Sequence, residues 1–173
     1  MDFENYPIQI EIENLVLDKL FSYFGTCSIW NHNTSIAIIF GDIENKQELL
    51  IDYLPLLEKY LGWLNQYKKN IVQALIDDNY LKGANQWTAW AKKEEDQEKE
   101  CYIIKGQKIF LPITEEDFAN SLYLDWISFD CAEGKNKITM ELFLTCSPDY
   151  FSGHTIIVFV AQDRTITEIV FSD

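Results

Sequence analysis

The sequence predicts an α+β fold in which an antiparallel sheet, built from N-terminal and C-terminal strands, is covered by helices from the middle of the chain. Three observations support this class. Residues 1–45 hold short alternating apolar runs, residues 46–91 hold apolar residues at helical spacing, and strand-like runs return in residues 101–173. Because 173 residues is an ordinary size for one core, we expect a single domain.

Residues 1–45 are expected to form consecutive short strands. In one stretch isoleucine alternates with a polar residue, at Ile8, Ile10 and Ile12. Further on, residues 26–30 and 35–40 flank a polar segment, residues 31–34, whose asparagines tolerate left-handed dihedral angles. We therefore predict a hairpin with His32 at a solvated tip.

The period changes at Lys46, where apolar residues begin to recur every three or four positions. The series is Leu49, Tyr53, Leu57, Tyr60, Leu64, Tyr67, Ile71 and Leu75. This spacing predicts helices with one buried face over residues 46–91. Pro55 lacks a donor and clashes with the preceding turn, so a kink or a helix start is expected near it. Another break is expected near residues 77–79 or 82–83.

Residues 92–100 contain no apolar side chain, so we expect a mobile acidic loop or a solvated helix extension. A strand-like run follows at residues 101–104. Thr114 and Asp117 then have the spacing of a capping box, which predicts a short helix that begins with acidic residues near the positive end of its dipole.

The last third of the chain predicts a four-stranded meander. Its strands are expected at residues 122–130, 137–146, 155–161 and 165–171, with turns at residues 132–136 and 163–164. Residues 155–161 are apolar on both faces, which is typical of a central strand.

The loop at residues 147–154 holds the candidate site, because it places ionisable and aromatic residues between two strands. We expect His154 to be buried and hydrogen-bonded at the start of the third strand, with Asp149 as its nearest partner. The candidate binding residues are Asp149, Tyr150, Phe151, Gly153 and His154 in the loop, and the acidic residues Glu115, Glu116, Asp117 and Glu133 elsewhere.

Several classes of function are disfavoured by composition. Arg164 is the only arginine, and no glycine-rich phosphate motif occurs, so nucleotide chemistry is not expected. The four cysteines form no C-x-x-C pair, and the chain has two histidines, so we expect structural thiols, no metal and no cofactor. The N-terminus has no signal-peptide pattern and no apolar run is long enough to cross a membrane, which predicts a soluble cytoplasmic protein.

The net charge of −14 is distributed unevenly along the chain. Residues 1–45 carry seven acidic groups and one Lys, residues 46–93 five acidic groups and seven Lys, and residues 94–173 sixteen acidic and six basic groups. Such a surface repels nucleic acid and anionic lipid, and it favours a basic protein partner. Solubility alone is the other explanation of the charge.

The chain contains several short motifs: Leu15-Val16-Leu17-Asp18, Phe24, Asn85-Gln86-Trp87, Pro112-Ile113-Thr114, Phe118 and Tyr150-Phe151-Ser152-Gly153-His154. These motifs and the order of the elements resemble an uncharacterised bacterial family, domain of unknown function 2262. The resemblance covers roughly residues 15–171 and implies no established activity. Where the family usually has a turn glycine, this chain has Arg164-Thr165, and it ends at Ser172-Asp173 without a terminal glycine.

Two functional classes follow from these observations. The first is an acidic protein-interaction module, of which a bacterial immunity-type protein that blocks a basic partner is the concrete version. The second is a hydrolase-like enzyme in which Asp149 orients His154 as a general base. No Ser or Cys nucleophile has a recognisable local context, and a metal site would need His32 brought to the same loop. We therefore favour the non-catalytic module.

Overall fold

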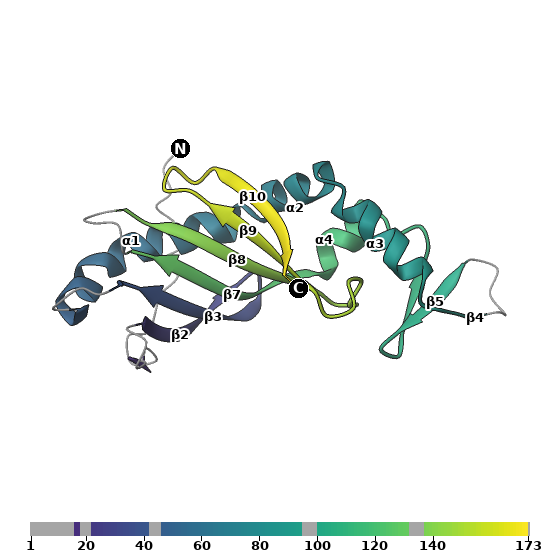
Figure 1. Cartoon of the computed structure of the whole chain (residues 1–173), viewed down its shortest axis with the longest axis horizontal. Coiled ribbons are helices and arrows are strands. Elements are labelled where there is room, and N and C mark those ends of the chain that lie inside the picture. The colour runs from purple at the N-terminus through teal and green to yellow at the C-terminus, as the bar shows by residue number, and fades with distance from the viewer. Residues whose placement is uncertain (1–15, 18–21, 42–45, 95–99, 132–136, 173) are drawn as a thin grey trace.

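A computed structural model describes residues 16–17, 22–41, 46–94, 100–131 and 137–172. The predictions for Ile8, Ile10 and Ile12, for residues 95–99 and for the turn at residues 132–136 lie outside these residues. Figure 1 shows one large sheet with helix α1 behind it, and a small sheet that extends beyond the helices at one end.

The large sheet has seven strands in the order β1-β2-β3-β7-β8-β9-β10. All neighbouring pairs are antiparallel except β3 and β7, which are parallel and join the N-terminal to the C-terminal strands. The α+β class is therefore confirmed, with one parallel pair that the prediction of an antiparallel sheet lacked. The strands are β1 (Val16–Leu17), β2 (Ser22–Ile29), β3 (His32–Ile39), β7 (Leu122–Asp130), β8 (Thr139–Cys146), β9 (Thr155–Val160) and β10 (Ile166–Ser172).

The helices are α1 (Lys46–Gln66), α2 (Lys68–Asp77), α3 (Tyr80–Ala89) and α4 (Glu115–Ser121). The break between α2 and α3 is confirmed, because Asn79 has a left-handed φ of 68°. Of the two alternatives predicted near Pro55, the helix start is wrong, since α1 continues through it, and the kink stays a prediction. The carbonyl that loses its helical partner there belongs to Ile51, which is 61% exposed and so open to water.

The core lies between these helices and one face of the large sheet. Six of the eight residues of the predicted helical stripe are buried, and Leu49 and Tyr67 are half-buried. On the sheet, alternate residues of each strand face this core, as β8 shows with a strictly alternating burial pattern. The four predicted meander strands are confirmed to within about two residues at each end.

A small antiparallel sheet contains β4 (Lys92–Glu94), β5 (Cys101–Ile104) and β6 (Gln107–Phe110). The prediction that residues 92–100 form a loop or helix extension is thus wrong for the first three, which pair with β5. The turn between β5 and β6 consists of Lys105 and Gly106, whose φ angles are 46° and 82°. Glycine adopts such angles without strain, which suits a two-residue hairpin.

Two other turns contain residues with positive φ. The β2–β3 turn is only Trp30 and Asn31, both with positive φ, so His32 is the first paired residue of β3 and not a turn tip. The last turn, predicted at residues 163–164, is confirmed, and Arg164 has a φ of 69° there. Its guanidinium lies 5.1 Å from the ring centroid of Tyr60, a cation–π contact that offsets the backbone strain.

The capping box at the start of α4 is confirmed. The Thr114 hydroxyl accepts from the Asp117 N–H at 3.1 Å, and the Asp117 carboxylate accepts from the Thr114 N–H at 3.1 Å. These two hydrogen bonds satisfy backbone groups that a helix end would otherwise leave unpaired. At the other end of α4, a hydrogen bond from Ser147 N–H to the Ser121 carbonyl holds the helix beside the loop at residues 147–154.

Candidate functional site

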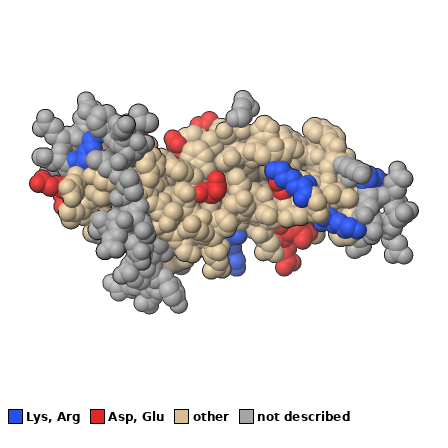
Figure 2. All heavy atoms as spheres, turned by 90° about the horizontal axis from the view of Figure 1, so that it is seen from below, with Lys and Arg blue, Asp and Glu red and all other residues tan. Residues whose placement is uncertain are grey.

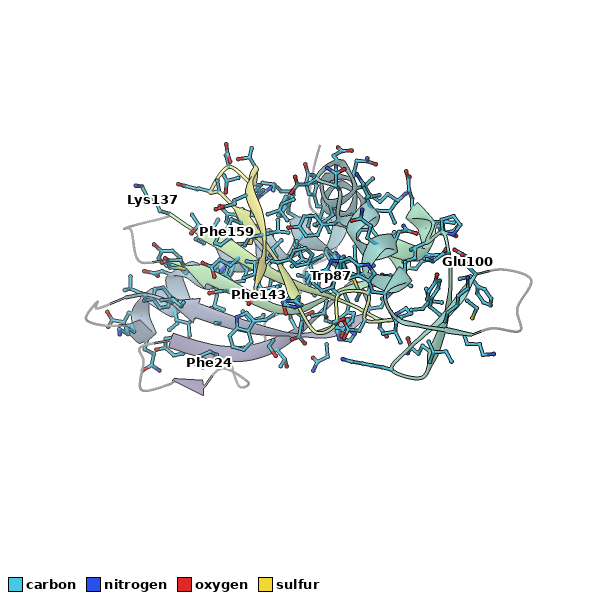
Figure 3. All side chains as sticks on the ribbon, turned by 45° about the vertical axis from the view of Figure 1, so that its right-hand side comes forward. Phe24, Trp87, Glu100, Lys137, Phe143 and Phe159 are labelled. Carbon is cyan, nitrogen blue, oxygen red and sulfur yellow. The ribbon has the colours of Figure 1, made fainter. Side chains whose placement is uncertain are left out.

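The face of the large sheet that points away from α1 carries large apolar side chains outside the core. We call it the open face and define it by half-buried residues of β2, β7, β8, β9 and β10: Phe24, Trp126, Phe143, Ile157, Phe159 and Val170, with Glu141 and Glu168. Because side chains alternate along a strand, Phe143 points opposite to the buried Leu142 and Leu144. Figure 3 labels Phe24, Phe143 and Phe159 on three strands of this sheet.

Strand register places these side chains in rows. Trp126 pairs with Phe143, Phe143 with Ile157, and Ile157 with Val170, so four apolar residues cross β7 to β10 in line. Phe24 reaches this row from β2, with its ring centroid 5.6 Å from that of Trp126. Cross-strand neighbours of this kind are in side-chain contact, which makes the row a continuous apolar strip.

A second row contains the carboxylates. Glu141 pairs with Phe159, and Phe159 pairs with Glu168, so one aromatic ring lies between two acids on neighbouring strands. Adjacent strands are about 4.8 Å apart, which separates the two acidic residues by roughly 10 Å. Within the described residues, no ion pair involves either carboxylate. The row therefore presents negative charge on both sides of an apolar surface.

The predictions from the sequence do not include the open face, although the apolar residues on both faces of β9 indicate it. The apolar residues on both faces of residues 155–161 predict a central strand. β9 does lie inside the sheet, paired with β8 and β10, but only Ile156, Val158 and Val160 are buried. Ile157 and Phe159 are half-buried on the open face. An apolar second face can mean either a covering layer or a surface for another molecule.

Asp149 is tied to its own loop and to the small sheet. Its carboxylate accepts from Gly153 N–H at 2.9 Å and forms an ion pair with the Lys105 ammonium at 2.6 Å. Burial alone would raise the pKa of this carboxyl, but the hydrogen bonds from Lys105 and Gly153 and the positive charge of Lys105 lower it overall. The side chain is 17% exposed. Asp149 thus connects the β5–β6 turn to the loop.

His154 has a partner other than the expected Asp149. Its Nδ1 lies 3.1 Å from the Ser172 carbonyl oxygen, so Nδ1 carries the proton and donates. The imidazole is half-buried and meets the Trp87 ring edge to face, with centroids 5.2 Å apart. No hydrogen bond in the described part of the chain joins Asp149 to His154. The carboxylate–imidazole pair required by the hydrolase hypothesis is therefore not formed.

The two aromatic residues of the loop face inward. Tyr150 and Phe151 are 4% and 1% exposed. Burial raises the pKa of Tyr150 to about 12. Phe151 packs against the rings of Tyr80, Trp87 and Phe118, with centroid distances of 5.9–6.5 Å. They anchor the loop, in which Ser147, Ser152 and Gly153 are exposed and the last two have positive φ.

Of the candidate acidic residues, Asp117 lines a hollow together with Ser147, Pro148 and Tyr150 of the loop. Glu115, Glu116 and Asp117 are exposed in the first turn of α4, and Glu133 lies outside the described residues. Seen from below in Figure 2, the described residues show Asp and Glu interspersed with Lys and Arg, without a patch of one sign. On this side of the molecule the excess acid is not concentrated.

The thiols have the properties of core residues. Cys27, Cys101, Cys131 and Cys146 are all buried and none forms a disulfide. Burial raises the pKa of the Cys27, Cys131 and Cys146 thiols to about 12. In the described ranges, no three His, Cys, Asp or Glu side chains lie close enough to hold a metal ion. Likewise, none of the described helices combines the length and apolar character needed to cross a bilayer.

Five residues that carry the family resemblance meet at one place. The Asn85 side chain contacts the backbone of Ile113, and Trp87, Phe118 and Phe151 pack together. This junction joins α3, α4 and the loop at residues 147–154. The shared motifs thus maintain the fold there, whereas Phe24 lies on the open face.

Comparison with known proteins identifies a family without an assigned activity. The model of the family described as "Uncharacterized protein conserved in bacteria (DUF2262)" matches residues 11–170. Neither the comparison with curated proteins nor that with solved structures found a match. The match spans the helices, both sheets and the loop at residues 147–154. The chain therefore belongs to the bacterial family of domain of unknown function 2262.

Proposed function

We propose that this chain is an acidic protein-interaction module that binds a basic protein partner through the open face. An immunity-type protein that covers a basic bacterial toxin is the most concrete form of this function. The net charge of −14 supports a basic partner, because opposite charges speed association and disfavour acidic competitors. The four buried thiols support a reducing compartment such as the cytoplasm.

The row Glu141–Phe159–Glu168 is the observation that carries the proposal. A lysine or arginine of the partner can lay its aliphatic stem on the Phe159 ring and place its charge near a carboxylate on either side. The apolar row beside it, from Trp126 to Val170, supplies the surface that a protein interface buries at its centre. The two rows together match a partner surface that is basic and partly apolar.

Binding by variants of the full chain tests this proposal. We expect a basic protein to bind the wild type, and we expect this binding to be lost in the double variant Phe143→Ser/Phe159→Ser. Phe110→Ser is the matched control, because Phe110 is 47% exposed on the small sheet and not on the open face. The partner is captured from lysate of the native bacterium, purified, and its Kd measured with each variant. Equal affinity for wild type and double variant, or an acidic partner, would contradict the proposal.

Salt and charge reversal give a second test. Association should slow as ionic strength rises while the dissociation rate changes little, because steering is screened and close contacts are not. Glu168→Lys should slow association more than reversal of Glu115 or Glu116, which lie on α4. If the α4 variants have the larger effect, the partner binds the acidic residues first considered from the sequence, and the open face is not the site.

A further inference from the structure

A hollow of about 380 Å³ lies where the β2–β3 turn, the first residue of α2 and the first residues of β7 meet. Its described lining includes Lys68, Trp30, His32, Asn120 and Tyr123, and none of its described lining residues is Asp or Glu. Its size is in the usual range for a small-molecule site.

Lys68 is the charged group of this hollow. Its ammonium donates to the Leu122 carbonyl at 2.9 Å and lies 5.3 Å from the ring centroid of Trp30. Among the described residues, no carboxylate lies within ion-pair distance of it. Burial lowers the pKa of Lys68, as expected for an ammonium removed from water without a counterion. A partly buried charge of this kind is stabilised by an anion.

The surrounding groups suit an anion attached to a flat ring. The Asn120 amide can donate to an anionic oxygen. Trp30 presents its ring to the Lys68 side, and the rings of His32 and Tyr123 are 4.3 Å apart between centroids. Such ring faces stack well on planar ligands.

A neighbouring hollow limits where the anion can lie. It has a volume of about 610 Å³, shares Lys68 and Asn120 with the first, and is also lined by Glu115 and Glu116. Those carboxylates repel an anion. The side with Trp30 and His32 is therefore the favourable one.

We propose that the hollow beside Lys68 binds a small organic molecule in which an anionic oxygen group, a carboxylate or a phosphate, adjoins a flat ring. Lys68 serves as the counterion and Trp30, His32 and Tyr123 contact the ring. This site is distinct from the open face, and its occupancy does not depend on the interaction proposed above.

The test is an NMR titration of the full-length protein with acetate, benzoate, inorganic phosphate and phenyl phosphate, against sodium chloride at equal ionic strength. We expect saturable shifts of the Trp30 indole and Asn120 amide signals with a millimolar Kd, and tighter binding of benzoate than of acetate. Comparison of benzoate with phenyl phosphate identifies the preferred anion. Absence of saturation with all four probes would overturn the proposal.

Variants separate binding from structure. Lys68→Met should weaken binding at least about tenfold, because it removes a charge-assisted hydrogen bond, whereas Lys69→Met on the exposed neighbour should not. In the wild type, where folding is not in question, the tightest probe should raise the measured pKa of Lys68, since an anion favours the charged form. An unchanged pKa at saturation, or equal binding by folded Lys68→Met, would show that Lys68 only supports the Leu122 carbonyl.

Discussion

The Asn85 side chain forms a paired hydrogen-bond contact with the backbone of Ile113, 28 residues away in sequence. Its carbonyl oxygen accepts from the Ile113 N–H at 2.8 Å, and its amide nitrogen lies 3.4 Å from the Ile113 carbonyl and 2.9 Å from that of Leu81. The amide thereby ties α3 to the segment that precedes α4. One side chain thus satisfies both backbone groups of Ile113, which lies outside helix and strand, and it also donates to the Leu81 carbonyl inside α3.

Replacing Asn85 by alanine should therefore destabilise the fold by about 1–3 kcal/mol, because partly buried backbone groups lose their partner. Gln86→Ala is the matched control, since Gln86 is exposed on the same helix. The free energy of unfolding of each variant is measured by urea denaturation. If both variants were equally stable, the contact would contribute nothing beyond helix propensity.

Replacing Gly83 or Gly153 by alanine should change the stability of the protein in opposite directions. Gly83 lies inside α3, and a Cβ added there would meet Phe151 Cε1 at 3.7 Å, an ordinary contact. Gly83→Ala should stabilise the protein by about 0.5–1 kcal/mol, as expected in a helix interior. Gly153 has a φ of 92°, so Gly153→Ala should destabilise by about 1 kcal/mol or more despite open space around it. Thermal and urea unfolding compare the two, and destabilisation by Gly83→Ala would indicate unexpectedly tight packing against Phe151.

The cysteines should be inert in the folded protein. With the pKa of Cys27, Cys131 and Cys146 raised to about 12 by burial, almost no thiolate exists at neutral pH. A chromogenic disulfide reagent should therefore detect no thiol in native buffer and four in denaturant. Rapid reaction of one thiol under native conditions would reveal local opening of the element that carries it.

Patterns among residues close together in the sequence predicted most helices and strands well. The period-3.6 spacing located the helical region, the alternation in residues 122–171 located the meander, and the spacing of Thr114 and Asp117 located the start of α4. Each of these signals is carried by residues within a few positions of one another. Strands β4 and β6, with three and four residues, are too short to show a period.

Contacts between distant residues could not be predicted in this way. Asp149 was paired with His154 because both lie in one loop, yet its partner is Lys105, brought near by the β5–β6 hairpin. The parallel pairing of β3 with β7 depends on the intervening helices returning the chain to the same end of the sheet. The open face required the same information, since only the arrangement of α1 decides which apolar face of β9 is covered.

The ion pair of Asp149 should make the stability of the protein depend on pH. Hydrogen bonds and charge from Lys105 and Gly153 outweigh burial and lower the pKa of Asp149 below its ordinary value of 3.8. A carboxyl whose folded pKa is lowered stabilises the fold above the unfolded pKa, and that contribution is lost as pH falls through the folded pKa. Asp149→Asn should therefore be less stable than the wild type at neutral pH, by about 1 kcal/mol because the pair is partly solvated.

Urea unfolding of both proteins between neutral pH and strongly acidic pH measures this dependence. The difference in the free energy of unfolding should be constant above about pH 5 and shrink as the pH falls below 3.8. Lys105→Met serves as a second variant, in which the pKa of Asp149 should rise because burial then acts with only the hydrogen bonds within the loop. A difference between wild type and Asp149→Asn that grows on acidification would show that Asp149 is protonated in the folded protein, and that its bond to Lys105 does not hold the loop.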